Sequence, residues 1–548
     1  VIVTGNNLMS SSNGGNDVYV PTDRGITSLS IESASGDCKL YVTNASTSLN
    51  LYANGIPITI GEKVYIDGTL YGGCNASDLV LKDGENIDIT VKGKSAIIYG
   101  GCNSADMTSE GSSAINITVT ETGDIGSVYG GGYNSNIGTK DRPISVTIDI
   151  EGVDFDNRVG KVTSPRVYGG GMLRDATGTF RQYGDIKIMT GEKSFAGGNG
   201  SDNLPIIYGG GQAEPPDTGD AVLEIVGNID ISIASADFSD TERSSCIGAI
   251  YGGGYATTNV PPNNCTATSR VVGDVHLGIN RYADHIYGGP YAYKKRHIGE
   301  ISGDITIDLY KITSGTEYVS DVVGGGFIDG FGKINVNGSI TVNLHDGAKV
   351  IHGEKLNGGV KISSGGGEAN IAGNININIG DGCSMDDLDT WLIGCADITA
   401  SSTSVVNIGG DVKVKAGDDF ICSRFYGAYI DSTDGEVSIA KDLSFSAGDR
   451  MNVTYRFYGA GYVSGKLNAQ NVGIKIGDNF ISNGPIYCAG QVYGDGTTYT
   501  PSITIANNVE TSIGDNLVGT WFYAGGSLTG SSTASKGTLS IGGDIRTT

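Results

Sequence analysis

Short stretches along the chain alternate strictly between apolar and polar residues. Three of them, Ile87–Val91, Ile115–Val119 and Ile144–Ile150, carry Ile or Val at every second position and Asp, Asn, Ser or Thr between. Alternation with a period of two predicts β-strands that bury one face and expose the other. No stretch of comparable length has the 3.6-residue period of a helix. The pattern therefore predicts an all-β protein.

A second motif, an apolar residue followed by Tyr-Gly-Gly, recurs between these stretches, and we call its tyrosine position the anchor. From Tyr71 to Tyr523 the mean anchor spacing is about 35 residues, within the range of repeat architectures. The well-formed anchors are Tyr71, Tyr99, Tyr129, Tyr168, Tyr208, Tyr251 and Tyr287. Degenerate copies are predicted at Val323–Gly326, Ser364–Gly367 and Ile393–Cys395, and copies with Ala or Cys among the glycines follow Tyr426, Tyr458, Tyr487 and Tyr523.

Each repeat offers two or three short strands and cannot bury its apolar face alone. Stacking of neighbouring repeats would bury one continuous, narrow core. We therefore predict a parallel β-solenoid (β-helix) of about 14 coils, in which glycines form the corners and anchor tyrosines stack on one another. The alternative is a β-propeller, whose kelch or WD40 blades need about 40 to 50 residues. The spacing from Tyr71 to Tyr99 is only 28 residues, which favours the solenoid.

Three regions are predicted along the chain. Residues 1–60 contain short strands without the anchor motif and are interpreted as an N-terminal β cap. Residues 61–375 carry the Tyr-Gly-Gly-Gly solenoid repeats, and residues 376–548 carry divergent solenoid repeats that end in mid-repeat. We expect either that the natural chain continues beyond Thr548 or that this end stacks on another molecule.

The repeats also suggest a family. Tyr-Gly-Gly-Gly anchors followed by Gly-Asp or Gly-Asn turns and alternating strands, as in Gly184–Ile188 and Gly303–Leu309, resemble repeats of secreted bacterial and archaeal adhesin-like surface proteins with parallel β-helix folds. The resemblance implies an extracellular, cell-surface, non-catalytic protein. It carries over no catalytic residue.

Composition and charge narrow the function classes. Glycine accounts for 88 of the 548 residues, roughly twice its usual share, which fits a fold with many corners. The formal net charge of −24 argues against binding to nucleic acid, because phosphate-binding surfaces need clustered Lys and Arg. The apolar runs are only a few residues long, so we expect no membrane insertion.

Catalysis and cofactors find little support in the sequence. A pectinase-like reading would need several catalytic motifs, and only the Asp pairs Asp386–Asp387 and Asp418–Asp419 are present. The stretch Gly197–Pro205 is similar to a single calcium-binding repeat, with Asn199 and Asp202 as weak candidate ligands. Such repeats share calcium ions between successive coils, and no tandem copy is present in the sequence. We therefore predict no catalytic residue, no cofactor and no metal other than this weak calcium candidate.

The nine cysteines do not have the spacing of zinc ligands. Cys74 and Cys102 follow Tyr-Gly-Gly in adjacent repeats, so stacking would place them one strand apart, at roughly 4.8 Å. In-register residues of parallel strands are poorly oriented for a disulfide. Buried thiols are the favoured interpretation.

Two functional hypotheses follow. The first is a structural or adhesive surface protein, a rigid acidic rod that binds a cell surface, a host ligand or an extracellular glycan and associates end to end. The second is carbohydrate binding or polysaccharide processing along an exposed groove. Tyrosines shortly after an anchor are the candidate glycan contacts, because aromatic rows stack on sugar rings: Tyr133, Tyr255, Tyr291, Tyr429 and Tyr462.

Overall fold

The computed structural model consists of strands and connecting turns, and its described residues contain no helix. They fall into two compact units, Val1–Asp274 and Val275–Thr548, which are treated separately below. None of the described residues belongs to a helix that is long and apolar enough to cross a membrane. The structure describes residues 2–4, 17–19, 29–32, 38–40, 49–154, 165–196, 204–216, 219–234, 247–257, 265–281, 283–293, 296–311, 319–350, 355–385, 390–494, 500–530 and 537–548.

One coil of the first unit shows how the alternating stretches and the anchors are used. The chain runs through β14 (Ile144–Asp154) in one sheet and then β15 (Arg166–Tyr168), which ends at the anchor Tyr168, in a second sheet. Glycines 169–171 bend the chain into β16 (Met172–Arg174), still in the second sheet, and β17 (Gly178–Tyr183) lies in a third. The chain then returns to the first sheet as β18 (Ile186–Ala196). We call the alternating-strand sheet A, the anchor-containing sheet B and the remaining sheet C.

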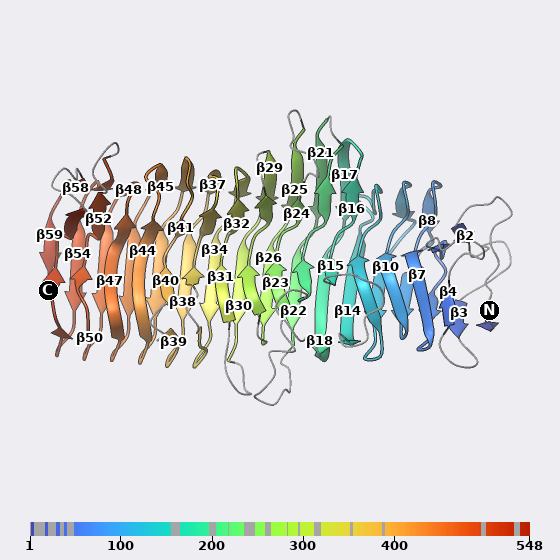
Figure 1. The fold of residues 1–548 in the computed structure, drawn as a ribbon, viewed down its shortest axis with the longest axis horizontal. Coiled ribbons are helices and arrows are strands. Elements are labelled where there is room, and N and C mark those ends of the chain that lie inside the picture. Colours follow the sequence, from blue (N-terminus) through green and yellow to red (C-terminus); the bar gives the residue numbers. More distant parts are fainter. Residues whose placement is uncertain are drawn as a thin grey trace. The chain divides into compact units, whose positions relative to one another are not determined.

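In the first unit the strands repeat along each sheet (Figure 1). Sheet A contains β1 (Ile2–Thr4), β3 (Leu29–Glu32), β6 (Ile58–Ile60), β9 (Ile87–Val91), β12 (Ser113–Val119), β14 (Ile144–Asp154), β18 (Ile186–Ala196) and β22 (Ile229–Ile233). Sheet B contains β2 (Asp17–Tyr19), β4 (Cys38–Leu40), β5 (Leu49–Tyr52), β7 (Val64–Tyr71), β10 (Lys94–Tyr99), β13 (Asp124–Tyr129), β15 (Arg166–Tyr168), β16 (Met172–Arg174), β19 (Ile206–Tyr208), β20 (Gln212–Glu214), β23 (Ile247–Tyr251) and β24 (Tyr255–Ala256). Sheet C contains β17 (Gly178–Tyr183), β21 (Ala221–Val226) and β25 (Ala267–Val272), and β8 (Leu79–Leu81) pairs with β11 (Met107–Ser109).

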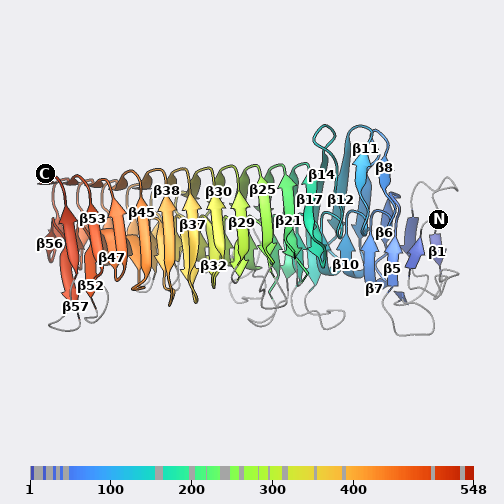
Figure 2. The ribbon, with the colours of Figure 1, turned by 90° about the horizontal axis from the view of Figure 1, so that it is seen from above.

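The second unit has the same three sheets, whose strands are seen from above in Figure 2. Sheet A contains β26 (Val275–Ile279), β30 (Ile305–Leu309), β34 (Ile340–Leu344), β38 (Ile375–Ile379), β43 (Val412–Ala416), β46 (Leu443–Ala447), β49 (Val472–Ile476), β54 (Val509–Ile513) and β59 (Ile545–Thr547). Sheet B contains β27 (Ala283–Tyr287), β28 (Tyr291–Tyr293), β31 (Val319–Val323), β32 (Gly326–Asp329), β35 (Lys355–Asn357), β36 (Val360–Ser363), β39 (Ser384–Met385), β40 (Trp391–Ile393), β41 (Ala396–Ile398), β44 (Ile421–Ile430), β47 (Asn452–Val463), β50 (Ile481–Ser482), β51 (Ile486–Tyr487), β52 (Gln491–Gly494), β55 (Val518–Gly519), β56 (Phe522–Tyr523) and β57 (Ser527–Gly530). Sheet C contains β29 (His297–Ile301), β33 (Lys333–Val336), β37 (Gly367–Ile371), β42 (Ser404–Ile408), β45 (Gly435–Ile439), β48 (Lys466–Ala469), β53 (Ser502–Ile505) and β58 (Thr538–Ile541).

Neighbouring strands in each sheet pair in parallel and in register. In sheet A of the first unit Ile117 lies between Ile89 and Ile148, and Ile148 in turn lies beside Ile188. All four side chains are buried, while the residues that precede and follow each of them in its strand are at least partly exposed. The parallel β-solenoid predicted from the sequence is thereby confirmed. The β-propeller alternative is wrong, because its blades would need antiparallel strands within separate small sheets.

The anchor tyrosines form an aromatic ladder in each unit. In the first unit the ladder begins at Tyr52, which lacks the anchor motif, and the rings from Tyr52 to Tyr251 stack in chain order, with centroids 4.6–5.1 Å apart and ring planes within 11° of parallel. The second unit has a ladder of the same kind, in which four rings stack in chain order: Tyr426, Tyr458, Tyr487 and Tyr523. Ring separations of this size are those of stacked aromatic pairs. The predicted stacking of anchors one coil apart is confirmed.

Where a glycine directly follows an anchor tyrosine, close approach of the next coil requires it. A Cβ atom on Gly288 would collide with the carbonyl oxygen of Gly324 and lie 2.6 Å from Ile305 Cγ2. Because φ at Gly288 is not in the left-handed region, the constraint is one of space rather than backbone conformation. Glycine therefore lets the backbone bend sharply against the core of its own coil and the backbone of its neighbour.

Lack of space for a Cβ atom also explains the glycine of the Gly-Asp pairs that lie in the turn after a strand of sheet A. The backbone N–H of Asp418 donates to Asp381 Oδ1 of the preceding coil at 2.8 Å, and the N–H of Asp449 donates to Asp418 Oδ1 at 2.9 Å. A Cβ atom on Gly417 would overlap Asp381 Oδ1. Glycine makes room for the carboxylate of the preceding coil, and the backbone N–H of the Asp that follows the glycine donates to that carboxylate, so the pair recurs wherever this turn is stacked.

One predicted anchor is placed wrongly by the sequence pattern. The register of sheet B puts Asn357, followed by Gly358 and Gly359, between Val323 and Ile393. The glycines of Ser364–Gly367 instead lead into β37 of sheet C. The error arises because three consecutive glycines resemble the anchor more than Asn-Gly-Gly does. The bounds proposed for the cap (residues 1–60) and for the two repeat regions stay predictions.

Candidate functional site

The five candidate glycan-contact tyrosines all lie just after the glycine bend in sheet B, and all are half-buried. Tyr133 meets the anchor Tyr99 edge to face, with ring centroids 5.7 Å apart. Tyr255 lies against the anchor Tyr208 at 5.3 Å. Met172 and Gln212 stand between Tyr133 and Tyr255 in the same column of side chains. The two tyrosines of the first unit are therefore not a continuous aromatic row.

In the second unit the post-glycine tyrosines are closer together. Tyr429 and Tyr462 are neighbours in register, with centroids 5.7 Å apart, and Tyr493 lies 5.9 Å from Tyr462. Tyr291 stacks on Phe327 at 5.5 Å. Much of each ring face is thus covered by an aromatic neighbour, and their role as glycan contacts stays a prediction.

Sequence reasoning missed a group of charged and aromatic residues in the same corner of sheet B. Trp391 and Lys355 precede the glycine bend in neighbouring coils, while Lys361 and Asp397 follow it. Lys355 Nζ donates to Asp397 Oδ2 at 2.9 Å, and Lys361 forms a close ion pair with Asp321. We call Asp321, Lys355, Lys361, Trp391 and Asp397 the corner cluster.

Burial dominates the electrostatics of the corner cluster. Asp397 is 1% exposed, and its desolvation raises the pKa of the carboxyl group although Lys355 opposes this effect. Lys355 Nζ also lies 4.4 Å from the centroid of the Trp391 ring, and the guanidinium of Arg424 lies 5.1 Å from it. These distances are those of cation–π contacts. The cluster therefore holds charge in a partly water-excluded, aromatic setting.

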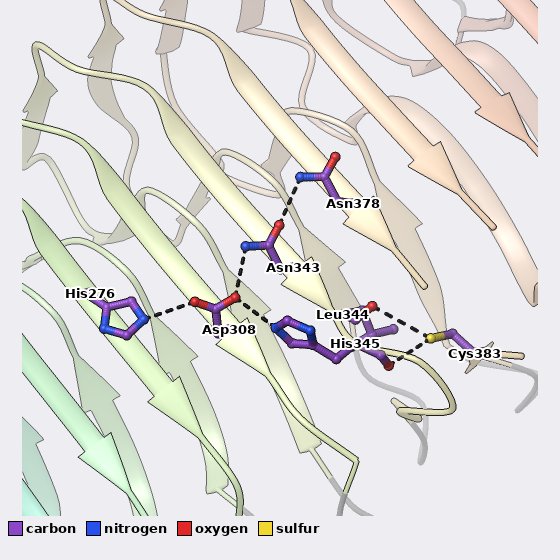
Figure 3. A network of polar contacts seen from close by, with 7 residues as sticks. All are labelled: His276, Asp308, Asn343, Leu344, His345, Asn378 and Cys383. Atoms are coloured by element: carbon purple, nitrogen blue, oxygen red, sulfur yellow. Dashed lines mark hydrogen bonds and ion pairs between the residues drawn. The ribbon is translucent and has the colours of Figure 1, made fainter. Parts of the chain in front are cut away.

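Figure 3 shows a second polar network, on the outer face of sheet A in the second unit. Asp308 Oδ2 and Oδ1 lie 2.9 Å from His276 Nε2 and His345 Nε2, respectively. Asn343 Nδ2 donates to Asp308 Oδ1 at 2.9 Å, and Asn378 Nδ2 donates to Asn343 Oδ1 at the same distance. Strands β26, β30, β34 and β38, together with the residue after β34, supply these side chains. The network joins four successive strands by side-chain hydrogen bonds.

The hydrogen bonds to Asp308 should make the second unit sensitive to acid. Burial acts to raise the pKa of this carboxyl group, but the bonds from Asn343, His345 and His276 outweigh it and lower the pKa. A lowered folded-state pKa contributes stability that is complete above the unfolded-state value of about 3.9 and is lost as the pH falls through the folded-state value. We expect urea unfolding to show that Asp308→Asn is destabilising at pH 7 and that the difference shrinks at pH 3. An equal difference at both pH values would contradict this assignment.

No group of three or more His, Cys, Asp or Glu side chains in the described part of the chain is arranged to hold a metal ion. The weak calcium candidates Asn199 and Asp202 lie outside the described residues, as does the Asp386–Asp387 pair. The other acidic pair lies in a Gly-Asp turn, where Asp418 accepts a backbone hydrogen bond and Asp419 Oδ1 accepts from Arg450 Nε at 2.6 Å. The Arg450 hydrogen bond lowers the pKa of Asp419.

Cys74 and Cys102 lie next to each other in adjacent coils as free thiols. The Cys74 backbone N–H points at Cys102 Sγ, 3.2 Å away. The hydrogen bond from the Cys102 side chain lowers the pKa of Cys74 to about 7, whereas the same contact raises the pKa of Cys102. Cys74 is half-buried and Cys102 is buried. Only the first thiol combines access with a large thiolate fraction at neutral pH.

Cys74 is therefore expected to be the most reactive of the described thiols. Iodoacetamide labelling followed by peptide mass spectrometry should modify Cys74 first, with a rate that rises to half its maximum near pH 7 because the thiolate is the nucleophile. In Cys102→Ser the midpoint should move toward the ordinary thiol value of about 8.5. An unchanged midpoint in that variant would show that Cys102 does not stabilise the thiolate.

No family model, no curated protein and no solved structure matches the chain. The resemblance to adhesin-like surface proteins therefore rests on the repeats alone.

Proposed function

We propose that this chain is a non-catalytic structural and adhesive protein of an extracellular cell surface. The observation that carries the proposal is the repeated construction of its coils, in which the same anchor ladder, glycine bend and Gly-Asp turn recur within a unit. Each coil is stabilised by contacts with its neighbours. Repeating the coil therefore extends the outer surface without requiring a different kind of core. The surplus of acidic residues (60 against 36 basic) would keep this surface hydrated.

The proposed partners are an extracellular glycan or a host ligand, with association between copies of the chain as a further proposal. A carbohydrate partner is supported by the aromatic side chains that follow the glycine bends, among them Tyr429 and Tyr462. Aromatic rings and polar groups side by side suit a ligand with both apolar C–H faces and hydroxyl groups. Carbohydrate binding is thus the second candidate function, and it is compatible with adhesion.

Adhesion is tested by coating beads with the purified chain. Beads should be retained on surfaces that carry extracellular polysaccharides or animal-cell glycans, and retention should be lost after heat denaturation. Beads coated with an unrelated protein of similar net charge provide the control for electrostatic attachment. Retention no greater than that of this control on every surface would reject the adhesive function.

A further inference from the structure

Two cysteines occupy the same position after the glycine bend in adjacent coils of the first unit. Cys74 and Cys102 each follow a Tyr-Gly-Gly sequence, and the asparagines directly after them pair in parallel. In the next coil the same position holds Gly132, so the column of thiols does not continue in that direction. The neighbouring coils therefore bring two thiol groups together at one corner of sheet B.

The side chain of Cys102 leans toward the preceding coil. The backbone N–H of Cys74 donates to Cys102 Sγ at 3.2 Å, and a Cβ atom on Gly73 would overlap the same sulfur atom. The Cys102 thiol also forms a side-chain hydrogen bond with Cys74. Coils one strand spacing apart, at about 4.8 Å, lie within the Cα separations of roughly 4.4–6.8 Å that disulfides span. Because Cys102 Sγ points across the gap between the coils, the parallel orientation that disfavours a disulfide within a regular strand is reduced here.

The two thiols differ in access and in ionisation. Among the cysteines that the structure describes, Cys74 alone is not fully buried, whereas Cys102 is 0% exposed. The contact with Cys102 lowers the pKa of Cys74 to about 7, while the same contact and burial raise the pKa of Cys102. Thiols that react with oxidants are accessible, have a low pKa and lie beside a second cysteine. Cys74 has all three properties, and Cys102 is the second cysteine.

We propose that Cys74 is a site of oxidation by hydrogen peroxide and that Cys102 converts the oxidised Cys74 into a disulfide between two coils. In the first step the Cys74 thiolate attacks one oxygen of the peroxide, the O–O bond breaks, hydroxide leaves, and Cys74 becomes a sulfenic acid. In the second step Cys102 Sγ attacks Cys74 Sγ and the S–O bond breaks. The hydroxyl group leaves as water with the proton that Cys102 gives up. Two thiols have then lost two electrons to one peroxide molecule, which is reduced to two molecules of water.

This modification site goes beyond the proposed adhesive function and does not depend on it. The disulfide would join covalently two coils that the stacked anchors and parallel strands otherwise hold together. Hydrogen peroxide is small enough to reach a half-buried sulfur atom without a pocket. The buried Cys102 needs no access to solvent, because it reacts only with Cys74.

Peptide mapping of the full chain tests the site. The chain is reduced, the reductant is removed, peroxide is added at pH 7, and the remaining thiols are alkylated before digestion with trypsin. Because Lys82, Lys92 and Lys94 separate the two cysteines, Cys74 and Cys102 fall in different peptides unless a disulfide joins them. Mass spectrometry without reduction should detect the joined peptides in monomeric protein, and dithiothreitol should separate them.

Three variants assign the two roles. Cys102→Ser should lose the joined peptides and accumulate a sulfenic acid at Cys74, which dimedone traps. Cys74→Ser should also lose the joined peptides and keep Cys102 as a thiol, because the buried sulfur is not oxidised directly. Cys488→Ser removes a buried thiol of the second unit and is the matched control, in which the joined peptides should form as in the wild type.

The proposal is rejected if peroxide produces no joined peptides in the wild type, a result that does not depend on the folding of any variant. A disulfide that links two copies of the chain through Cys74 would also reject it. Equal dimedone labelling of Cys74 in the wild type and in Cys102→Ser, with both shown to be folded by thermal melting, would show that Cys102 does not react with the sulfenic acid and would reject its assigned role.

Discussion

Replacing Gly288 by alanine is expected to destabilise the second unit by about 2–4 kcal/mol. The added Cβ would collide with the carbonyl oxygen of Gly324 and would crowd Ile305 Cγ2, and neither the backbone of the next coil nor the packed core can easily move. Such a substitution cannot be relieved by a change of rotamer, because the methyl group is fixed by the backbone. The measurement is the free energy of unfolding in urea.

Gly473 provides a matched control in the same unit. It lies within β49, and a Cβ atom there would have only Ser444 Cβ nearby, at 3.8 Å. Gly473→Ala should be neutral or stabilising by up to about 1 kcal/mol, because glycine in a strand loses more conformational freedom on folding than alanine does. Equal destabilisation by the two substitutions would show that close approach of coils does not explain the glycine after the anchor.

Ile148→Asp is expected to cost several kcal/mol and to open the first unit locally. Ile148 is fully buried between Ile117 and Ile188, so a carboxylate at this position would have neither water nor a cation as partner. Because each coil contacts its neighbours, hydrogen exchange measured by mass spectrometry should increase most in β12, β14 and β18. Asp149→Asn changes the adjacent outward-facing residue and should alter the free energy of unfolding by less than about 0.5 kcal/mol. Uniform exchange throughout the first unit would contradict local opening.

The fold was predictable because its main determinants are local and repeated. Alternation in stretches such as Ile115–Val119 identifies the strands of sheet A, and the apolar-Tyr-Gly-Gly motif identifies the bends of sheet B. Because the repeats differ in length, the sequence alone does not show which residues of neighbouring coils lie side by side. Without the hydrogen bonds between coils, three glycines at 365–367 are a more conspicuous anchor than Asn357, although only Asn357 lies in the ladder column.

The corner cluster was not predictable for a related reason. Lys355 and Asp397 are 42 residues apart in sequence and lie on opposite sides of the bend, so they meet only once the coils are stacked. No motif contains both residues, and the coils that supply them are those in which the anchor tyrosine is missing. The network of His276, Asp308 and His345 was not predictable either, because its residues come from different coils. They occupy outward positions that elsewhere are usually Asp, Asn, Ser or Thr. A break in a regular column of residues is the signal that could have directed attention to this corner.

The most direct test of the proposed function measures binding and cleavage on the same sample. The purified chain is incubated with immobilised mannan, xylan and pectin, and both the retained protein and the released reducing ends or unsaturated sugars are quantified. An adhesive, non-catalytic protein should be retained on at least one polysaccharide and release no product above the level of a heat-denatured control. Product release by the wild type that is abolished in a folded Asp386→Asn, Asp387→Asn double variant would contradict the account and identify a polysaccharide-processing enzyme.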